Sequence, residues 1–227
     1  MANYPLAPYD RCPTQVYSVL RALKWLKRTR NVSKLVLAGD SAGGNLATFV
    51  AALLEVPTML PYRIDPEDIP EIIGVISLYG ILDRHSWTQH TPQLSYFENV
   101  LSRFALRLLF FAYTGDQDFA NDNSSSRGHP FNKCVTLCDL IPLISKFPPT
   151  LLIVGRLDVL VHSSRLAHQL LTDRNFQSEL LEYDSRHAFI GLPPDLNFQH
   201  TYFNHAKPAT EEIVRFLDHL YNTKIKR

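Results

Sequence analysis

Lys34-Leu-Val-Leu-Ala-Gly-Asp-Ser-Ala-Gly-Gly44 is the stretch that decides the fold of this 227-residue chain. It opens with a short apolar run to Ala38, typical of a strand buried within a sheet. The pattern Gly-x-Ser-x-Gly follows at once, and a helix is expected from about Gly44 to Glu55. A serine on so tight a turn is held clear of the sheet, with free helix N–H groups behind it. Ser41 is therefore a candidate nucleophile.

Strands and helices alternate outward from this stretch. An amphipathic helix is expected before it, over 14–28, where apolar residues recur at helical spacing. Beyond it we expect buried strands over 72–79, 150–154 and 178–183, and helices over 161–175 and 208–221. Such alternation predicts an α/β fold, with a mainly parallel sheet and helices on both faces.

The alternation breaks between Leu82 and Lys146, in a stretch rich in aromatic residues. We expect a helical, cap-like insertion over 82–146 within one domain that spans 1–227. Inside it, three side chains share helical spacing and favour a core role: Phe104, Leu108 and Phe111. Three others are predicted to contact a ligand in a pocket: Trp87, Tyr96 and, after the last strand, Phe189.

A serine hydroxyl is a weak nucleophile unless a histidine, oriented by a carboxylate, removes its proton. Asp158 follows the expected strand 150–154, and His187 follows the expected strand 178–183. Both loops lie at the carboxyl ends of parallel strands, where α/β sheets place their sites. The order Ser, Asp, His along the chain is that of hydrolases built on such a sheet. We therefore predict Ser41 as nucleophile, Asp158 as acid and His187 as base.

Other residues compete for these roles. Asp184 is closer to His187 in sequence, but it lies at the very end of its own expected strand, 178–183. This position favours Asp158 as the acid. Asp40, beside the serine, is interpreted as a structural residue of the turn. The remaining candidate bases fall at a helix start or in a polar loop: His162, His200 and His205.

These motifs together resemble the hormone-sensitive-lipase-like branch of the α/β-hydrolase fold. Residues 39–46 read G-D-S-A-G-G-N-L, 4–8 resemble its Y-R-L-A-P segment, and 148–158 resemble P-P-T-L-I-x-x-G-x-x-D. His187-Ala-Phe resembles its H-G-F. The resemblance implies a serine carboxylic ester hydrolase that acts through an acyl-enzyme on an apolar ester of short to medium acyl chain, with no cofactor and no metal.

Two departures from the family matter. Ala188 stands where the family has glycine, and the H-G-G motif that precedes Y-R-L-A-P and supplies most of the oxyanion hole is absent. The N–H of Ala42 is then the remaining oxyanion donor, and each lost donor costs about a hundred- to a thousandfold in rate. We interpret the chain as N-terminally truncated, with the first strands missing and an apolar sheet edge exposed. An inactive small-molecule-binding relative, or an amidase or formamidase with the same triad, is the alternative.

Composition excludes several partners. The 23 basic and 22 acidic residues nearly cancel, so nothing favours nucleic acid. The longest apolar run, 104–113, is interrupted by Arg107, so no membrane span is expected. Three cysteines, an odd number without a zinc-binding spacing, indicate reduced structural thiols and no metal site. We expect a cytoplasmic location by default, unless an N-terminal targeting segment or anchor is missing, and the sequence leaves the oligomeric state open.

Overall fold

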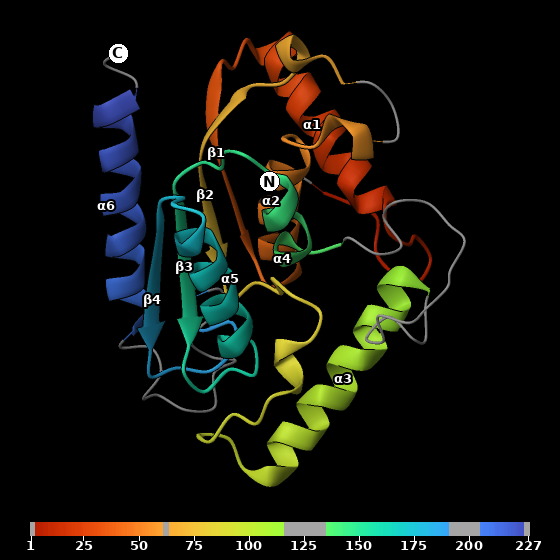
Figure 1. The fold of residues 1–227 in the computed structure, drawn as a ribbon, viewed down its shortest axis with the longest axis vertical. Helices are drawn as coiled ribbons and strands as arrows, with labels where there is room; N and C mark the ends of the chain where they lie inside the picture. The colour runs from red at the N-terminus through yellow and green to blue at the C-terminus, as the bar shows by residue number, and fades with distance from the viewer. Residues whose placement is uncertain (1–2, 61–63, 116–134, 191–204, 225–227) are drawn as a thin grey trace.

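The computed structural model describes residues 3–60, 64–115, 135–190 and 205–224. Its sheet has four parallel strands in the order β1-β2-β3-β4 (Figure 1). Their bounds are Lys34–Asp40 (β1), Glu71–Leu78 (β2), Thr150–Gly155 (β3) and Ser178–Tyr183 (β4). The predicted parallel sheet is confirmed, and each strand lies within two residues of its predicted bounds.

Helices cover both faces of the sheet, as predicted (Figure 1). Leu152 of β3 packs on one side, while its neighbours Leu151 and Ile153 pack on the other, so the period-2 alternation of a strand builds two cores. The first side carries α1 (Thr14–Arg30), α2 (Ala42–Leu53), α4 (Leu137–Leu140) and α5 (Val161–Asp173), and the second carries α6 (Ala206–Lys224). Short 3-10 turns lie at Pro57–Met59 and Pro66–Asp68.

The insertion between β2 and β3 is helical in its described part. It contains the 3-10 turn Ser86–Thr88, the long helix α3 (Tyr96–Thr114), α4 and the 3-10 turn Ile141–Leu143. In Figure 1, α3 lies beyond the end of the sheet at which the strand arrows point. The expected core role of three α3 side chains is wrong, because they are exposed: Phe104, Leu108 and Phe111.

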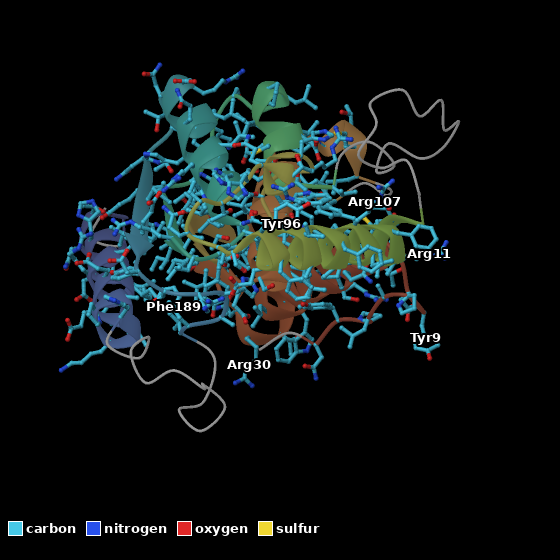
Figure 2. The ribbon with its side chains drawn as sticks, turned by 90° about the horizontal axis from the view of Figure 1, so that it is seen from below. Tyr9, Arg11, Arg30, Tyr96, Arg107 and Phe189 are labelled. Atoms are coloured by element: carbon cyan, nitrogen blue, oxygen red, sulfur yellow. The ribbon has the colours of Figure 1, made fainter. Side chains whose placement is uncertain are left out.

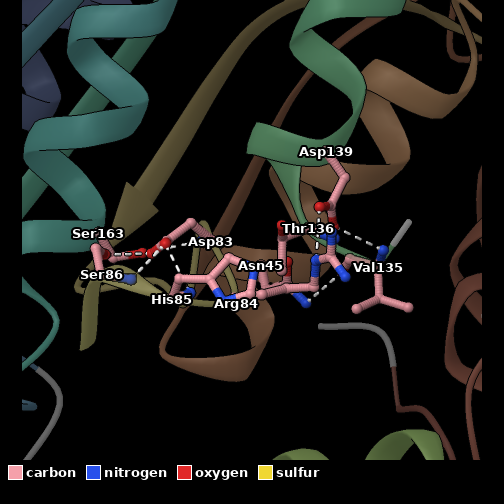
Figure 3. Close-up of polar contacts among 9 residues, drawn as sticks. All are labelled: Asn45, Asp83, Arg84, His85, Ser86, Val135, Thr136, Asp139 and Ser163. Carbon is pink, nitrogen blue, oxygen red and sulfur yellow. Dashed lines mark hydrogen bonds and ion pairs between the residues drawn. The ribbon is translucent and has the colours of Figure 1, made fainter. Parts of the chain in front are cut away.

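The start of the insertion is fixed to α5 by buried polar contacts (Figure 3). The hydroxyl of Ser163 accepts hydrogen bonds from the N–H groups of Leu82 and Asp83, at 2.8 and 3.0 Å. The carboxylate of Asp83 in turn accepts from the N–H groups of His85 and Ser86, at 2.9 and 2.6 Å. The chain is thus turned away from the sheet immediately after β2.

The end of the insertion is fixed to α2 in the same way (Figure 3). Asp139 accepts from the N–H groups of Val135 and Thr136, both at 3.0 Å, and pairs with Arg84 at 2.8 Å. Asn45 of α2 donates to the carbonyl of Val135 at 3.2 Å. Because α5 holds one end of the insertion and α2 holds the other, its described part has a defined position over the carboxyl ends of the strands.

Three further observations concern the molecule as a whole. β1 forms the end of the sheet, and its residues are half-buried or exposed. Cys12 and Cys138 are free thiols, while Cys134 lies outside the described residues. None of the helices in the described part of the chain combines the length and apolarity needed to cross a bilayer.

Candidate active site

Ser41 lies at a sharp turn between β1 and α2. Its backbone N–H donates to the carbonyl of Leu78 in β2 at 2.9 Å, and α2 begins at the next residue, Ala42. Its dihedral angles are φ 49° and ψ −116°, a region that non-glycine residues rarely adopt. Such strain persists only where the surroundings impose it, and it clusters at functional sites.

Small residues allow the strand and the helix to approach this closely. A Cβ added at Gly39 would lie 2.2 Å from the carbonyl oxygen of Gly43, and one at Gly44 would lie 2.7 Å from the hydroxyl of Ser77. A Cβ at Gly43 would instead meet nothing nearer than 3.8 Å, where it would touch the Asp40 carboxylate. The turn therefore requires glycine at positions 39 and 44, whereas the last glycine of the Gly-x-Ser-x-Gly pattern is spatially dispensable.

The three side chains predicted from the sequence lie in one hydrogen-bonded series. Nε2 of His187 is 3.0 Å from Oγ of Ser41, and its Nδ1 is 2.7 Å from Oδ2 of Asp158. Asp158 is buried, and its other oxygen accepts from the N–H of Leu160 at 3.0 Å. The carboxylate is thus held in one orientation, and it in turn orients the imidazole.

Two packed loops bring Asp158 and His187 together. The loop after β3 donates from the N–H of Leu157 to the carbonyl of Ser185 at 3.0 Å, and a Cβ at Gly155 would lie 2.1 Å from that carbonyl oxygen. Ala188 has φ 62°, in the left-handed region that favours glycine. This backbone conformation would suit a glycine, as in the H-G-F pattern that this segment resembles.

The environment of His187 tunes its basicity. Partial burial by itself lowers the pKa of the imidazole, but the hydrogen bond and negative charge of Asp158, with a smaller contribution from Asp40, outweigh it, and the pKa is raised above 6.5. The ring of Tyr79 contacts the imidazole edge-on, with 5.0 Å between ring centroids. A raised pKa makes His187 a stronger base toward the serine hydroxyl.

The competing residues lie elsewhere. Asp184 is exposed and pairs with Arg156 at 2.8 Å. Asp40 is also exposed, and its negative charge helps to raise the pKa of His187. His162 is in the first turn of α5 with its Nε2 buried, and the ring of His205 faces Tyr183. His200 lies outside the described residues.

A cavity of about 470 Å³ opens beside Ser41. Most of its lining is apolar and comes from α3 and from the loop after β3, so the insertion forms one wall of the site. Besides Ser41, Asp158 and His187, the lining residues are Ile81, Leu94, Glu98, Leu101, Ser102, Ala105, Leu106, Leu109, Leu157, Val159, Leu160 and Arg186.

The three residues predicted to contact a ligand are not among those that line this cavity. Trp87 is buried and stacks on Phe110 beneath α3, with 5.8 Å between ring centroids. Phe189 is buried against Tyr79 on the α6 side of the sheet, and Tyr96 is 82 % exposed at the start of α3 (Figure 2). Aromatic character alone therefore did not identify the pocket wall, which is built of aliphatic side chains.

An ion pair that the sequence analysis missed crosses the mouth of the cavity. Arg186, next to His187, donates to the carboxylate of Glu98 in the first turn of α3 at 2.5 Å. The hydroxyl and the N–H of Ser95, followed by Arg186, lower the pKa of Glu98 to about 2. The Ser95–Glu98 capping box was readable in the sequence as a helix start, but its bond to the histidine loop was not.

Other possible sites are less equipped for chemistry. Among the described residues, no three histidine, cysteine or carboxylate side chains gather as metal ligands would. A larger hollow of about 780 Å³ lies at the amino ends of β1 and β2, and its lining includes Lys34, Glu71 and Lys146. Its lining includes Ser33 but no histidine, so it lacks a base for a nucleophile. The cavity beside Ser41 is therefore the stronger candidate site among the described residues.

Comparisons with other sequences identify the family of the chain. A family model described as alpha/beta hydrolase fold matches residues 1–191. A probable carboxylesterase 6 from Arabidopsis thaliana is 39 % identical over 72 residues, which are 28 % of this chain and 21 % of that protein. Arylacetamide deacetylase from Bos taurus is 44 % identical over 63 residues, 24 % of this chain and 16 % of that protein. A putative alpha/beta hydrolase of Acanthamoeba polyphaga mimivirus is 29 % identical over 165 residues, which are 70 % of this chain and 41 % of that protein.

Solved structures share the fold at low sequence identity. An esterase of the fungus Rhizomucor miehei superposes with a TM-score of 0.66 at 22 % identity, over 96 % of this chain and 62 % of that one. An esterase of Pyrobaculum calidifontis gives a TM-score of 0.64 at 19 % identity, over 93 % of this chain and 62 % of that one. The chain thus spans less than two thirds of these proteins, and less than half of the curated relatives.

Proposed function

The chain belongs to the alpha/beta hydrolase fold family, and on that premise we propose that it hydrolyses carboxylic esters, with Ser41 as the nucleophile. The observation that carries the proposal is the unbroken series of hydrogen bonds from Asp158 through His187 to Ser41, beside an apolar cavity. Neither the hydroxyl nor the imidazole needs to move far for proton transfer, since their heavy atoms are already 3.0 Å apart.

The reaction proceeds by acyl transfer. Nε2 of His187 takes the hydroxyl proton as Oγ of Ser41 bonds to the ester carbonyl carbon, and the bond from that carbon to the alcohol oxygen then breaks. The departing alcohol receives the proton from His187. Water, deprotonated by the same imidazole, attacks the acyl-enzyme and releases the carboxylic acid. Asp158 keeps the Nδ1–H in place and stabilises the imidazolium formed in both steps.

The negative charge that develops on the carbonyl oxygen needs hydrogen-bond donors. The N–H of Ala42 is the donor we assign, because it belongs to the first residue of α2 and has no partner within the helix. The partial positive charge at the helix N-terminus adds to its effect.

The cavity indicates the class of substrate. Leu101, Leu106 and Leu160 and their aliphatic neighbours suit an uncharged acyl chain, and a volume of about 470 Å³ suits a short to medium one. Two charged side chains of the lining, Glu98 and Arg186, pair with each other, so neither of them offers a net charge to an ionic substrate. We therefore propose a small apolar ester.

An amide is the second candidate. The name of the bovine relative, which aligns with 24 % of this chain, indicates removal of an acetyl group from arylacetamides. The same three side chains can attack an amide, provided that His187 protonates the leaving amine. The complete hydrogen-bonded series argues against a third candidate, an inactive binding protein, because such a protein has no need of an oriented base.

Labelling with a fluorophosphonate probe, combined with turnover of p-nitrophenyl esters of increasing acyl length, tests the proposal. We expect labelling and turnover by the native chain and neither in Ser41→Ala, a loss of about a thousandfold or more. Ser102→Ala is the matched control, since it removes another hydroxyl from the same cavity and retains the nucleophile. Turnover of p-nitroacetanilide in preference to the acetate ester would favour the amide. An unlabelled native chain would refute the serine hydrolase proposal.

A further inference from the structure

The outer side of α3 is apolar and has no partner among the described residues. Six side chains form it, and we call them the outer α3 face: Phe97, Val100, Leu101, Phe104, Leu108 and Phe111. Their exposed fractions run from 36 % at Phe111 to 72 % at Phe97. The three rings alone expose on the order of 300 Å², at roughly 200 Å² per ring, and monomers rarely leave large apolar patches uncovered.

The outer α3 face is broad. At about 100° per residue, the six side chains occupy a continuous arc, and exposed Tyr96 and Leu109 widen it to more than half of the circumference of the helix. The opposite side of α3 is anchored by buried Leu106 and Phe110. In Figure 1, α3 lies at the periphery of the molecule, and the side chains of the outer α3 face are exposed.

The charged side chains named here beside the outer α3 face, among the described residues, are positive. Arg107 projects at its edge, and exposed Arg11 lies beside Gly115 at the C-terminal end of the helix (Figure 2). Glu98 is the one carboxylate of α3, and Ser95 and Arg186 already engage it. A second copy of the chain would therefore bring like charges together, whereas an anionic surface would be attracted.

The face is continuous with the active-site cavity. Leu101 belongs to the outer α3 face and also lines the cavity, as do the exposed neighbouring side chains of Ala105 and Leu109. An apolar molecule that leaves a surface in contact with α3 would thus meet apolar side chains all the way to Ser41.

We infer that the outer α3 face binds a lipid surface that carries anionic headgroups. The helix lies in the plane of the surface, its aromatic and leucine side chains enter the boundary between headgroups and acyl chains, and Arg107 and Arg11 contact the phosphates. This surface presents apolar substrate to the cavity, but the binding itself does not depend on hydrolysis.

Flotation of the chain with vesicles tests the inference. We expect it to float with phosphatidylcholine–phosphatidylglycerol vesicles, less with phosphatidylcholine alone, and less in high salt. The variant Phe97→Gln/Phe104→Gln/Leu108→Gln should lose binding by about tenfold or more, because it removes the inserted side chains. None of these three lines the cavity, so turnover of a dissolved p-nitrophenyl ester should be unchanged, which separates this inference from the proposed hydrolysis.

The matched control is Trp25→Gln/Val214→Gln/Tyr221→Gln, which removes three apolar side chains that are about half exposed elsewhere on the surface. It should float as the native chain does, and Arg107→Gln should reduce the preference for the anionic vesicles. The inference fails if the native chain stays at the bottom of the gradient, or if both triple variants float equally. It also fails if sedimentation velocity shows a dimer that the first triple variant dissociates while vesicles bind neither form.

Discussion

At the residue scale, the proposed mechanism makes the charge of Asp158 control when His187 can act as the base. The imidazole accepts a proton only when it is neutral, so activity falls as pH drops through its pKa, which Asp158 helps to hold above 6.5. Removing that charge leaves burial, which lowers the pKa, as the larger influence. We expect Asp158→Asn to move the acid limb of the kcat/KM profile to lower pH and to reduce the rate by about 10⁴.

Asp184→Asn is the control for this change, because it removes a carboxylate near His187 in sequence that is paired with Arg156 instead. The measurement is hydrolysis of a p-nitrophenyl ester from acid to neutral pH in both variants and the native chain. If Asp184→Asn, and not Asp158→Asn, shifted the limb, Asp184 would be the acid.

At the scale of elements, the junction of β1 with α2 depends more on Gly39 than on Gly43. Gly39→Ala would place a Cβ 2.2 Å from a backbone oxygen that cannot rotate away, and we expect it to lower the free energy of unfolding by about 3 kcal/mol or more. Gly43→Ala adds the same methyl group where the nearest atom is 3.8 Å away, so its effect should stay within about 1 kcal/mol. Urea denaturation followed by circular dichroism compares the two, and equal losses would contradict the proposed close approach.

The elements that the sequence predicted well are those whose signal is local. Buried strands are short apolar runs, and the glycines around Ser41 reflect the turn they permit, so the sheet and the junction could be read directly. Ser41, Asp158 and His187 could be brought together because parallel strands end at one edge. No local pattern predicts the contact of Ser163 with Asp83, which joins residues 80 positions apart.

The insertion shows the limit of periodicity. The spacing of Phe104 and Leu108 correctly predicts that they share one side of a helix, but it does not say whether another element covers that side. Likewise, Trp87 is a large aromatic side chain near the site in sequence, yet it supports α3 from beneath. Which side of α3 faces the cavity depends on how the ends of the whole insertion are anchored, here through Asp83 and Asp139.

At the scale of the whole molecule, a second surface bears on association: the edge of β1 that pairs with no strand among the described residues. β1 pairs with β2 on one side, and α6 covers the sheet mainly over β2 and β3, which leaves Ala38 exposed. An edge strand with unpaired N–H and carbonyl groups is a template for pairing with another chain, and a lysine on it opposes that pairing. We expect Ala38→Lys to reduce light scattering on prolonged incubation by roughly twofold or more, with a melting temperature within about 2 °C of the native value.

The matched control is Tyr221→Lys, which adds the same charge to another exposed position, on α6. If association occurs through β1, this variant should aggregate nearly as the native chain does, because net charge alone changes little. Equal protection by both lysines would instead assign the effect to net charge. Protection by Phe104→Gln, on the outer α3 face, would move the contact from the sheet to the insertion, since that side chain is far from β1 along the chain and changes no strand pairing.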